Sequence, residues 1–375
     1  MLPFLPLLPY PQARALLAHP DRSPLDQVER FQAVVLFADI AGFTALSDAL
    51  SAEGSRGTEE LTGLLNDYFA TMIGLVESYG GMVCGFGGDA LMALFQVGAD
   101  DSAAGRAVTC ALAMQAAMAA SAGVHTSVGT FPLTMKIGLA VGPVACTSAG
   151  DPARRLVPLI AGPPLLASAA AEQRAEPGEI VATAALVAAL PSGTIQAGRR
   201  EADHTWIAGL AQADRWTLDP LPPLVPDEAA APLFLAYLHP AIATRLRDGA
   251  EHFINEHRVV TVLFVRFSDP NDIGDPAIAA LQQYVATIGE LSLRYDGFLA
   301  QVAIGDKGCT AMILFGAPIA HENDPLRALR CALDLRQASA SAGRSGSFSW
   351  AIGAPNRIMA VHPLSPIATW ARKPS

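Results

Sequence analysis

The segment AVVLFADIAGFT, residues 33–44, joins a run of apolar and β-branched residues to a turn of small residues. Its first five residues are typical of a buried strand. The Gly- and Ser-containing stretch 51–57 that follows predicts a loop, and residues 58–79 carry apolar side chains at helical spacing. Because the glycine pair at 80–81 would end such a helix, the opening predicts a strand, a loop and a helix in that order.

The next residues continue this unit with further strands and a second helix. Strands are expected over residues 82–86 and 90–95, joined by the turn Gly87-Gly88-Asp89. An alanine-rich helix over residues 107–124 and a strand over residues 133–141 follow. This mixture predicts an α+β fold, with an antiparallel sheet covered by helices on one face.

The same unit occurs a second time in the chain. The segment Val34-Val35-Leu36-Phe37 recurs as Thr261-Val262-Leu263-Phe264. Three further landmarks recur in the same order: residues 76–81 at 293–297, 91–95 at 311–315, and 110–112 at 331–333. Because the offsets stay between 216 and 227 residues, we expect the chain to contain two copies of one module.

Composition and the limits of the repeat divide the chain into five segments. We expect an N-terminal segment, a complete first module, a Pro-rich linker, a second module and a divergent tail, at residues 1–29, 30–216, 217–255, 256–353 and 354–375. The repeat similarity stops after Gly353. The second module is therefore expected to be incomplete at its C-terminal end.

Charge and cysteine usage narrow the classes of function. The chain of 375 residues is 51% hydrophobic and 16% charged, which gives ample material for folded cores. Its net charge of −10 argues against non-specific nucleic-acid binding, because that requires a basic face. The five cysteines are dispersed without a C-x-x-C pair, which indicates reduced thiols in a cytoplasmic protein.

Two apolar stretches could be mistaken for a targeting or a membrane segment. Residues 1–10 lack a basic region and are broken by three prolines, so a signal peptide is not expected. The alanine-rich stretch 107–124 contains Ser and Gly, which favours a core helix over a membrane span. No membrane-spanning segment is therefore predicted.

Two aspartates stand where they could hold metal ions. Asp39 ends the first predicted strand, and the turn after it opens a helix whose backbone N–H groups can bind an anion. Asp89 lies in the turn between the next two strands. Either residue alone would also suit a structural role, Asp39 as a helix cap and Asp89 as a turn residue. Together they could hold two divalent ions that activate a hydroxyl and stabilise a leaving pyrophosphate.

Four segments carry a resemblance to a known family. They are FADIAGFTALS at 37–47, ELTGLLNDYF at 60–69, VESYGGMVCGFGGDALMALF at 76–95 and MKIGLAVG at 135–142. These segments resemble the class III adenylate/guanylate cyclase catalytic domain. The tandem arrangement, over about residues 30 to 350, resembles the soluble, bicarbonate-responsive adenylyl cyclase branch. The resemblance implies two ferredoxin-like cyclase modules arranged as a pseudo-twofold pair.

The resemblance also implies roles for residues of the first copy. Asp39, Asp89 and the backbone carbonyl of Ile40 would bind two ions of Mg²⁺ or Mn²⁺. The triphosphate of the substrate ATP would be bound by a loop and by a strand lysine, namely Ala41, Gly42, Phe43, Thr44 and Lys136. The alternative for Lys136 is a solvated lysine on a strand.

The second copy lacks the two acids. Arg266 aligns with Asp39, and Cys309 aligns with Asp89. Lys307 matches the purine-reading lysine of the family and favours adenine, although it would also suit a turn. The resemblance therefore implies one active site for a nucleoside triphosphate, formed by intramolecular pairing of the two modules at their interface.

Two departures from the family pattern bear on activity. The family carries an Asn and an Arg that orient the nucleotide and neutralise the transition state, and Leu166 and Ala170 stand at these positions in the first copy. The second copy stops before its own motif, and losing such a cation typically costs several kcal/mol of transition-state stabilisation. Gly85 stands where the bicarbonate-responsive relatives have a lysine, which argues against activation by bicarbonate.

Three functions remain open at this point. The first is an adenylate cyclase that converts ATP to cAMP and pyrophosphate. The second is a catalytically inactive regulatory pair that keeps Asp39, Asp89 and Lys307 and binds nucleotide without turnover. The third is a guanylyl cyclase, against which Lys307 argues.

Overall fold

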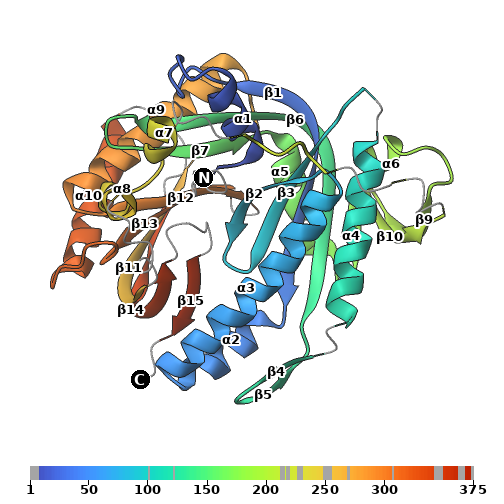
Figure 1. Cartoon of the computed structure of the whole chain (residues 1–375), viewed down its shortest axis with the longest axis horizontal. Helices are drawn as coiled ribbons and strands as arrows, with labels where there is room; N and C mark the ends of the chain where they lie inside the picture. Colours follow the sequence, from blue (N-terminus) through green and yellow to red (C-terminus); the bar gives the residue numbers. More distant parts are fainter. Residues whose placement is uncertain are drawn as a thin grey trace. The chain divides into compact units, whose positions relative to one another are not determined.

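The structure is a computed structural model of the chain (Figure 1), and it describes residues 8–99, 102–120, 123–211, 216, 220–225, 231–247, 256–267, 271–305, 308–341, 349–361 and 368–372. The chain divides into two compact units, which we describe separately. Of the described residues, the Asp39 unit comprises those of 30–144 and 162–223. The Cys309 unit comprises those of 1–29, 145–161 and 224–373.

The Asp39 unit is built on a βαββαβ core. Its elements run β1 (Glu29–Ala41), α2 (Phe43–Ala52), α3 (Ser55–Ser78), β2 (Met82–Gly87), β3 (Ala90–Gln96), α4 (Ala103–Ala120) and β6 (Thr134–Asp151). Neighbouring strands follow the order β2-β3-β1-β6, which is the order of a ferredoxin-like sheet. Helix α3 contacts β2, and helix α4 contacts β3. The α+β fold class predicted from the sequence is confirmed.

The sheet of this unit continues beyond the core and becomes mixed. The additional elements are β4 (Val124–Thr126), β5 (Gly129–Phe131), α5 (Pro163–Arg174), β8 (Ile180–Thr183), α6 (Ala184–Ala188), β9 (Ile195–Glu201) and β10 (His204–Leu210). Strand β8 pairs with β6 in parallel, with Ile137 opposite Ile180. The expectation of a wholly antiparallel sheet is therefore wrong, because the chain returns through α5 and enters β8 in the direction of β6.

The loop predicted at residues 51–57 is also wrong. Helix α2 ends at Ala52 and α3 begins at Ser55, so two residues separate the helices. Gly57 lies inside α3, where a Cβ atom would be 1.8 Å from the carbonyl oxygen of Leu50. The glycine is thus required for close packing of α3 against the end of α2, and it does not mark a loop.

An arginine of α4 closes the C-terminus of α3. Gly80 has a φ of 72°, and the N–H of Gly81 donates to the carbonyl of Val76 at 2.8 Å, as in a Schellman motif. The guanidinium of Arg106 donates to the carbonyl of Tyr79 at 3.2 Å. This hydrogen bond satisfies one of the carbonyls that the end of a helix leaves unpaired.

The Cys309 unit repeats the core of the Asp39 unit. Its elements run β11 (Glu256–Phe267), α9 (Asp275–Arg294), β12 (Phe298–Gly305), β13 (Gly308–Phe315), α10 (Asp324–Ser341), β14 (Ser349–Val361) and β15 (Ala368–Arg372). The strand order is β12-β13-β11-β14-β15, so its first four strands correspond to β2-β3-β1-β6. Part of β14 and all of β15 fall within the expected tail, residues 354–375, where the sequence showed no strand pattern.

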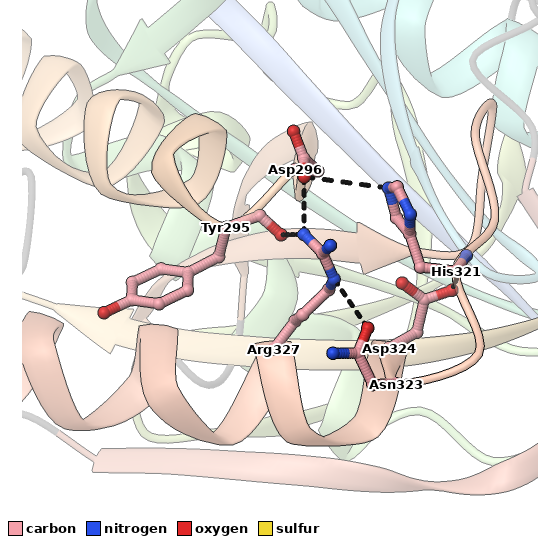
Figure 2. Close-up of polar contacts among 6 residues, drawn as sticks. All are labelled: Tyr295, Asp296, His321, Asn323, Asp324 and Arg327. Atoms are coloured by element: carbon pink, nitrogen blue, oxygen red, sulfur yellow. Dashed lines mark hydrogen bonds and ion pairs between the residues drawn. The ribbon is translucent and has the colours of Figure 1, made fainter.

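The hydrogen bond from an arginine to the end of the preceding helix, which we call the arginine clamp, recurs in this unit, where an acid is added (Figure 2). Asp296 has a φ of 54° at the position that Gly80 holds in the first copy. Arg327, which aligns with Arg106, donates to the carbonyl of Tyr295 at 3.3 Å and to the carboxylate of Asp296. His321 Nε2 lies 3.7 Å from the same carboxylate. The aspartate thus accepts the strain of a left-handed backbone and gains a cationic neighbour in Arg327.

A hairpin from the first copy belongs to the Cys309 unit. Strand β7 (Arg155–Ala161) pairs with residues 145–151 of β6. The guanidinium of Arg155 lies 3.9 Å from the ring centroid of Phe298 and donates to the carbonyls of Leu299 and Ala300 on β12. These contacts explain why residues 145–161 group with the second copy.

The expected Pro-rich linker, residues 217–255, contains two short helices among its described residues. They are α7 (Ala231–Leu235) and α8 (Pro240–Arg247). Phe234 and Tyr237 are buried, and the hydroxyls of Tyr237 and Ser148 are 2.5 Å apart. Helix α1 (Tyr10–Ala18) belongs to the same unit, where Gln12 donates to two carbonyls of the β6–β7 hairpin. No helix in the described ranges is long and apolar enough to cross a membrane.

Candidate functional site

The β1–β3 pairing brings Asp39 and Asp89 to the same end of the sheet. The last paired residues are Ala38 of β1 and Leu91 of β3, in an antiparallel register. Asp39 follows Ala38, and Asp89 stands two residues before Leu91. Both aspartates are half-buried. The strand pairing therefore places the two predicted metal ligands together.

A two-residue turn holds Asp89 at this edge. Gly87 pairs with Ala90 across the β2–β3 hairpin, which leaves Gly88 and Asp89 to form the turn. Gly88 has a φ of 76°, a left-handed conformation that favours glycine. The turn thus explains the sequence Gly-Gly-Asp, and it fixes the backbone position from which the Asp89 side chain extends.

A second glycine connects Asp39 to the start of α2. Gly42 has a φ of 95°, and a Cβ atom there would lie 2.8 Å from the carbonyl oxygen of Pro132. Helix α2 begins at the next residue, Phe43, and Thr44 at its first turn is exposed. Because the first N–H groups of a helix have no partner within it, the segment Ala41 to Thr44 sets anion-binding donors beside the carboxylates.

Burial and neighbouring acids raise the pKa of both carboxylates. Burial raises the pKa of Asp39 to about 7, and the charges of Asp89 and Glu172 add to the rise. The Lys136 ammonium and the backbone N–H of Ile40 act in the opposite direction. Burial likewise raises the pKa of Asp89 to about 6, with Glu172 contributing. Such a site favours either protons or added cations.

The predicted phosphate-binding lysine has an anionic neighbour. The ammonium of Lys136, on β6, forms an ion pair with the carboxylate of Glu172, on α5. The Glu172 side chain is only 6% exposed. Sequence reasoning missed Glu172, because a single acid in the alanine-rich stretch 163–174 gives no sign that it faces the sheet.

The donor set fits divalent ions that also bind a phosphorylated ligand. In the ranges that the structure describes, no group of three or more His, Cys, Asp and Glu side chains is arranged to hold a metal. Mg²⁺ commonly binds one or two protein carboxylates and completes its shell with water and phosphate oxygens. Asp39 and Asp89 meet that requirement.

The Cys309 unit offers no such pair at the equivalent place. Arg266 is exposed near the end of β11, and Cys309 is buried opposite Phe267. Lys307 lies outside the described residues. Leu166 and Ala170, which stand at the Asn and Arg positions of the family, lie on α5 and have no polar side-chain group.

The comparisons with known proteins agree with this geometry. Residues 27–213 match the family model of the adenylate and guanylate cyclase catalytic domain. The resemblance of the first copy to this family is thereby confirmed, and Asp39 and Asp89 both lie within the matched residues.

Individual relatives carry the same family name. The adenylate cyclase type 10 of Oryctolagus cuniculus is 24% identical over 351 residues, which is 85% of this chain and 22% of that protein. That of Rattus norvegicus is 39% identical over 85 residues, 22% of this chain and 5% of that protein. The chain therefore spans about a fifth of the length of the rabbit relative.

A similar solved structure is the adenylyl cyclase CyaB from P. aeruginosa. It is 26% identical, with 50% of this chain and 98% of that chain covered and a TM-score of 0.41.

Proposed function

We propose that the chain is an adenylate cyclase that converts ATP to cAMP and pyrophosphate. The observation that carries the proposal is that Asp39, near the end of β1, and Asp89, in the β2–β3 turn, lie at the same end of the sheet, beside the N-terminus of α2. The family of residues 27–213 and the adenylate cyclase relatives support it. The raised pKa values of both acids, caused mainly by burial, also support it, because a bound cation would offset the cost of burying their charges.

In the proposed reaction the ribose 3′-hydroxyl of ATP attacks the α-phosphorus. The new O–P bond closes the cyclic phosphodiester, the bond to the β-phosphate oxygen breaks, and the hydroxyl proton passes to solvent. Two divalent ions, when bound, would lower the pKa of that hydroxyl and neutralise charge on the phosphates. Asp39, Asp89 and the Ile40 carbonyl would hold the ions, and the N–H groups at the start of α2 would bind the triphosphate.

The proposal includes a single nucleotide-binding active site for the pair of modules. The acids of the first copy have no counterparts in Arg266 and Cys309, so the second copy would contribute Lys307 to purine recognition in place of metal ligands. The ammonium of Lys136, which forms an ion pair with Glu172, would also bind the phosphates of the ligand. We propose Mg²⁺ or Mn²⁺ as the ions and intramolecular pairing as the source of the complete site.

The cytoplasm is the proposed location. All five cysteines are free thiols, which suits a reducing compartment. Burial raises the pKa of Cys110 to about 12, so this thiol stays protonated and inert.

A second candidate function rests on one specific observation. Leu166 and Ala170 cannot stabilise a developing negative charge as the family's Asn and Arg do. The chain would then bind nucleotide and regulate a partner without turnover. No feature of the described residues favours guanylyl over adenylyl specificity.

The test is cAMP formation from ATP with Mn²⁺ or Mg²⁺, together with binding of a non-hydrolysable ATP analogue. We expect cAMP formation that falls about 100-fold or more in Asp39→Asn. Asp203→Asn, which removes an exposed acid of the same unit, is the control and should be unchanged. Metal-dependent binding without cAMP would support the inactive regulatory pair, and the absence of binding would contradict both functions.

A further inference from the structure

A tyrosine of α3 has a buried hydroxyl without a use in the fold. Tyr68 lies among the apolar residues of that helix, and its ring makes an edge contact with Phe69 at 4.9 Å between centroids. Its hydroxyl oxygen is buried and has no hydrogen-bond partner among the described residues. Buried hydroxyls are nearly always hydrogen-bonded, so an unpaired one indicates a partner that the described residues do not supply.

The position of this hydroxyl identifies the kind of partner. The carboxylates of Asp39 and Asp89 both raise the pKa of Tyr68, in addition to burial, so the hydroxyl lies within electrostatic reach of both acids. The neighbouring Phe69 ring contacts Phe86 of β2 at 4.8 Å, and β2 leads directly into the turn that carries Asp89. The tyrosine therefore borders the two-carboxylate site from the helix side.

The internal repeat supplies a matched comparison. The segment Tyr68-Phe69-Ala70-Thr71 of α3 aligns with Tyr284-Val285-Ala286-Thr287 of α9. Tyr284 lies in the module whose corresponding strand positions are Arg266 and Cys309. The same side chain thus occurs once beside two acids and once without them.

We propose that Tyr68 is a positioning residue of the metal site, whose hydroxyl hydrogen-bonds to an oxygen ligand of the divalent ions held by Asp39 and Asp89. This oxygen belongs to a water or to a phosphate group. Either can accept a hydrogen bond from a phenol and also complete the coordination shell of Mg²⁺. The hydroxyl fixes where that ligand sits, as outer-shell hydrogen bonds do around other metal ions. The inference rests on the proposed function, because it requires that the two acids bind metal.

The first part of the test concerns the metal-free protein. In the presence of a chelator, Tyr68→Phe should keep or raise the melting temperature, because it removes a buried hydroxyl that has no partner. A clearly lower melting temperature would overturn the proposal, since it would show that the fold itself uses the hydroxyl.

The second part measures binding by titration calorimetry, with Mn²⁺ alone and with Mn²⁺ plus a non-hydrolysable ATP analogue. Tyr68→Phe should raise the apparent dissociation constant about 10-fold, and Tyr284→Phe should leave it unchanged. A loss already seen with Mn²⁺ alone identifies a water as the ligand. A loss seen only with the analogue identifies a phosphate oxygen.

The outcomes separate this inference from the proposed function. Wild-type binding that is lost in Asp39→Asn but retained in Tyr68→Phe would overturn the role of Tyr68 and leave the metal site intact. Equal weakening by Tyr68→Phe and Tyr284→Phe would also overturn it, because the module of Tyr284 has Arg266 and Cys309 in place of the two acids. A wild-type chain that binds neither probe would refute both the site and the inference.

Discussion

At the residue scale, the acids of the site oppose folding when no cation is bound. Burial raises the pKa of Asp39 to about 7 from an ordinary value of 3.8, so the folded chain holds a proton more tightly than the unfolded chain. The resulting stabilisation is fully present below the unfolded pKa and is lost as the pH rises through the folded pKa. The metal-free protein should therefore lose stability between about pH 4 and pH 7 through this residue.

The corresponding prediction concerns Asp39→Asn in the presence of a chelator. At pH 8 the variant should be more stable than wild type by on the order of 1–3 kcal/mol, because it removes a charge that the fold disfavours. At pH 4 the two proteins should differ little. Urea denaturation at both pH values measures this, and Asp203→Asn should show no such difference. Equal stability of wild type and Asp39→Asn at pH 8 would contradict the assignment of the shift.

A backbone prediction applies at Gly42. Gly42→Ala should cost about 1–3 kcal/mol of unfolding free energy, because φ is 95° and the new Cβ would lie 2.8 Å from the Pro132 carbonyl oxygen. Gly63→Ala is the matched control. Gly63 lies inside α3 with open space around it, so alanine should stabilise by about 0.5–1 kcal/mol. Opposite signs in thermal denaturation are expected, and a neutral Gly42→Ala would show that the turn is not strained.

At the element scale, the two arginine clamps hold equivalent helix ends. Arg327 donates to the Tyr295 carbonyl and to Asp296, whereas Arg106 donates to the Tyr79 carbonyl alongside a glycine. Both clamps connect the helix after the third strand to the end of the preceding helix. The copies have kept the geometry while they exchanged the residue at the left-handed position.

The Arg327 clamp gives a prediction for the second copy. Arg327→Gln should lower the unfolding free energy by about 1–2 kcal/mol, because it leaves the Tyr295 carbonyl and the Asp296 carboxylate without their donor. Arg330→Gln, at an exposed position of the same helix, should stay within about 0.5 kcal/mol of wild type. Urea denaturation measures both variants. Equal effects would mean that the clamp does not stabilise the helix end.

The elements that sequence patterns predicted correctly are those with a strong local period. Strands β2 and β3 and helix α3 match the expected ranges within a few residues, since each carries regular apolar spacing. The loop at 51–57 was predicted wrongly, because Gly57 serves helix packing and not a turn. The parallel strand β8 could not be predicted either, because its partner is chosen by the path of α5 across the sheet.

The candidate site was partly predictable for the same reason. Asp39 and Asp89 stand at the ends of predicted strands, where carboxylates gather at one edge. Tyr68 and Glu172 could not be found from sequence, because one occupies an apolar helix face and the other an alanine-rich helix. Only the three-dimensional arrangement shows that both lie within electrostatic reach of the acids.

At the scale of the whole molecule, the repeat accounts for the architecture and for the asymmetry of function. Each unit contains the same four-strand order, yet two acids occur in one and Arg266 with Cys309 in the other. The proposed metal site is therefore confined to the first copy. The role proposed for the other copy is purine recognition through Lys307.

The central claim is that Asp39 and Asp89 act together as one metal site for a nucleotide. The most direct measurement is Mn²⁺ binding in the presence of a non-hydrolysable ATP analogue, followed by electron paramagnetic resonance in wild type, Asp39→Asn and Asp89→Asn. We predict that wild type binds Mn²⁺ and that each single variant loses at least about 10-fold in affinity. Binding that persists unchanged in both variants would contradict the account.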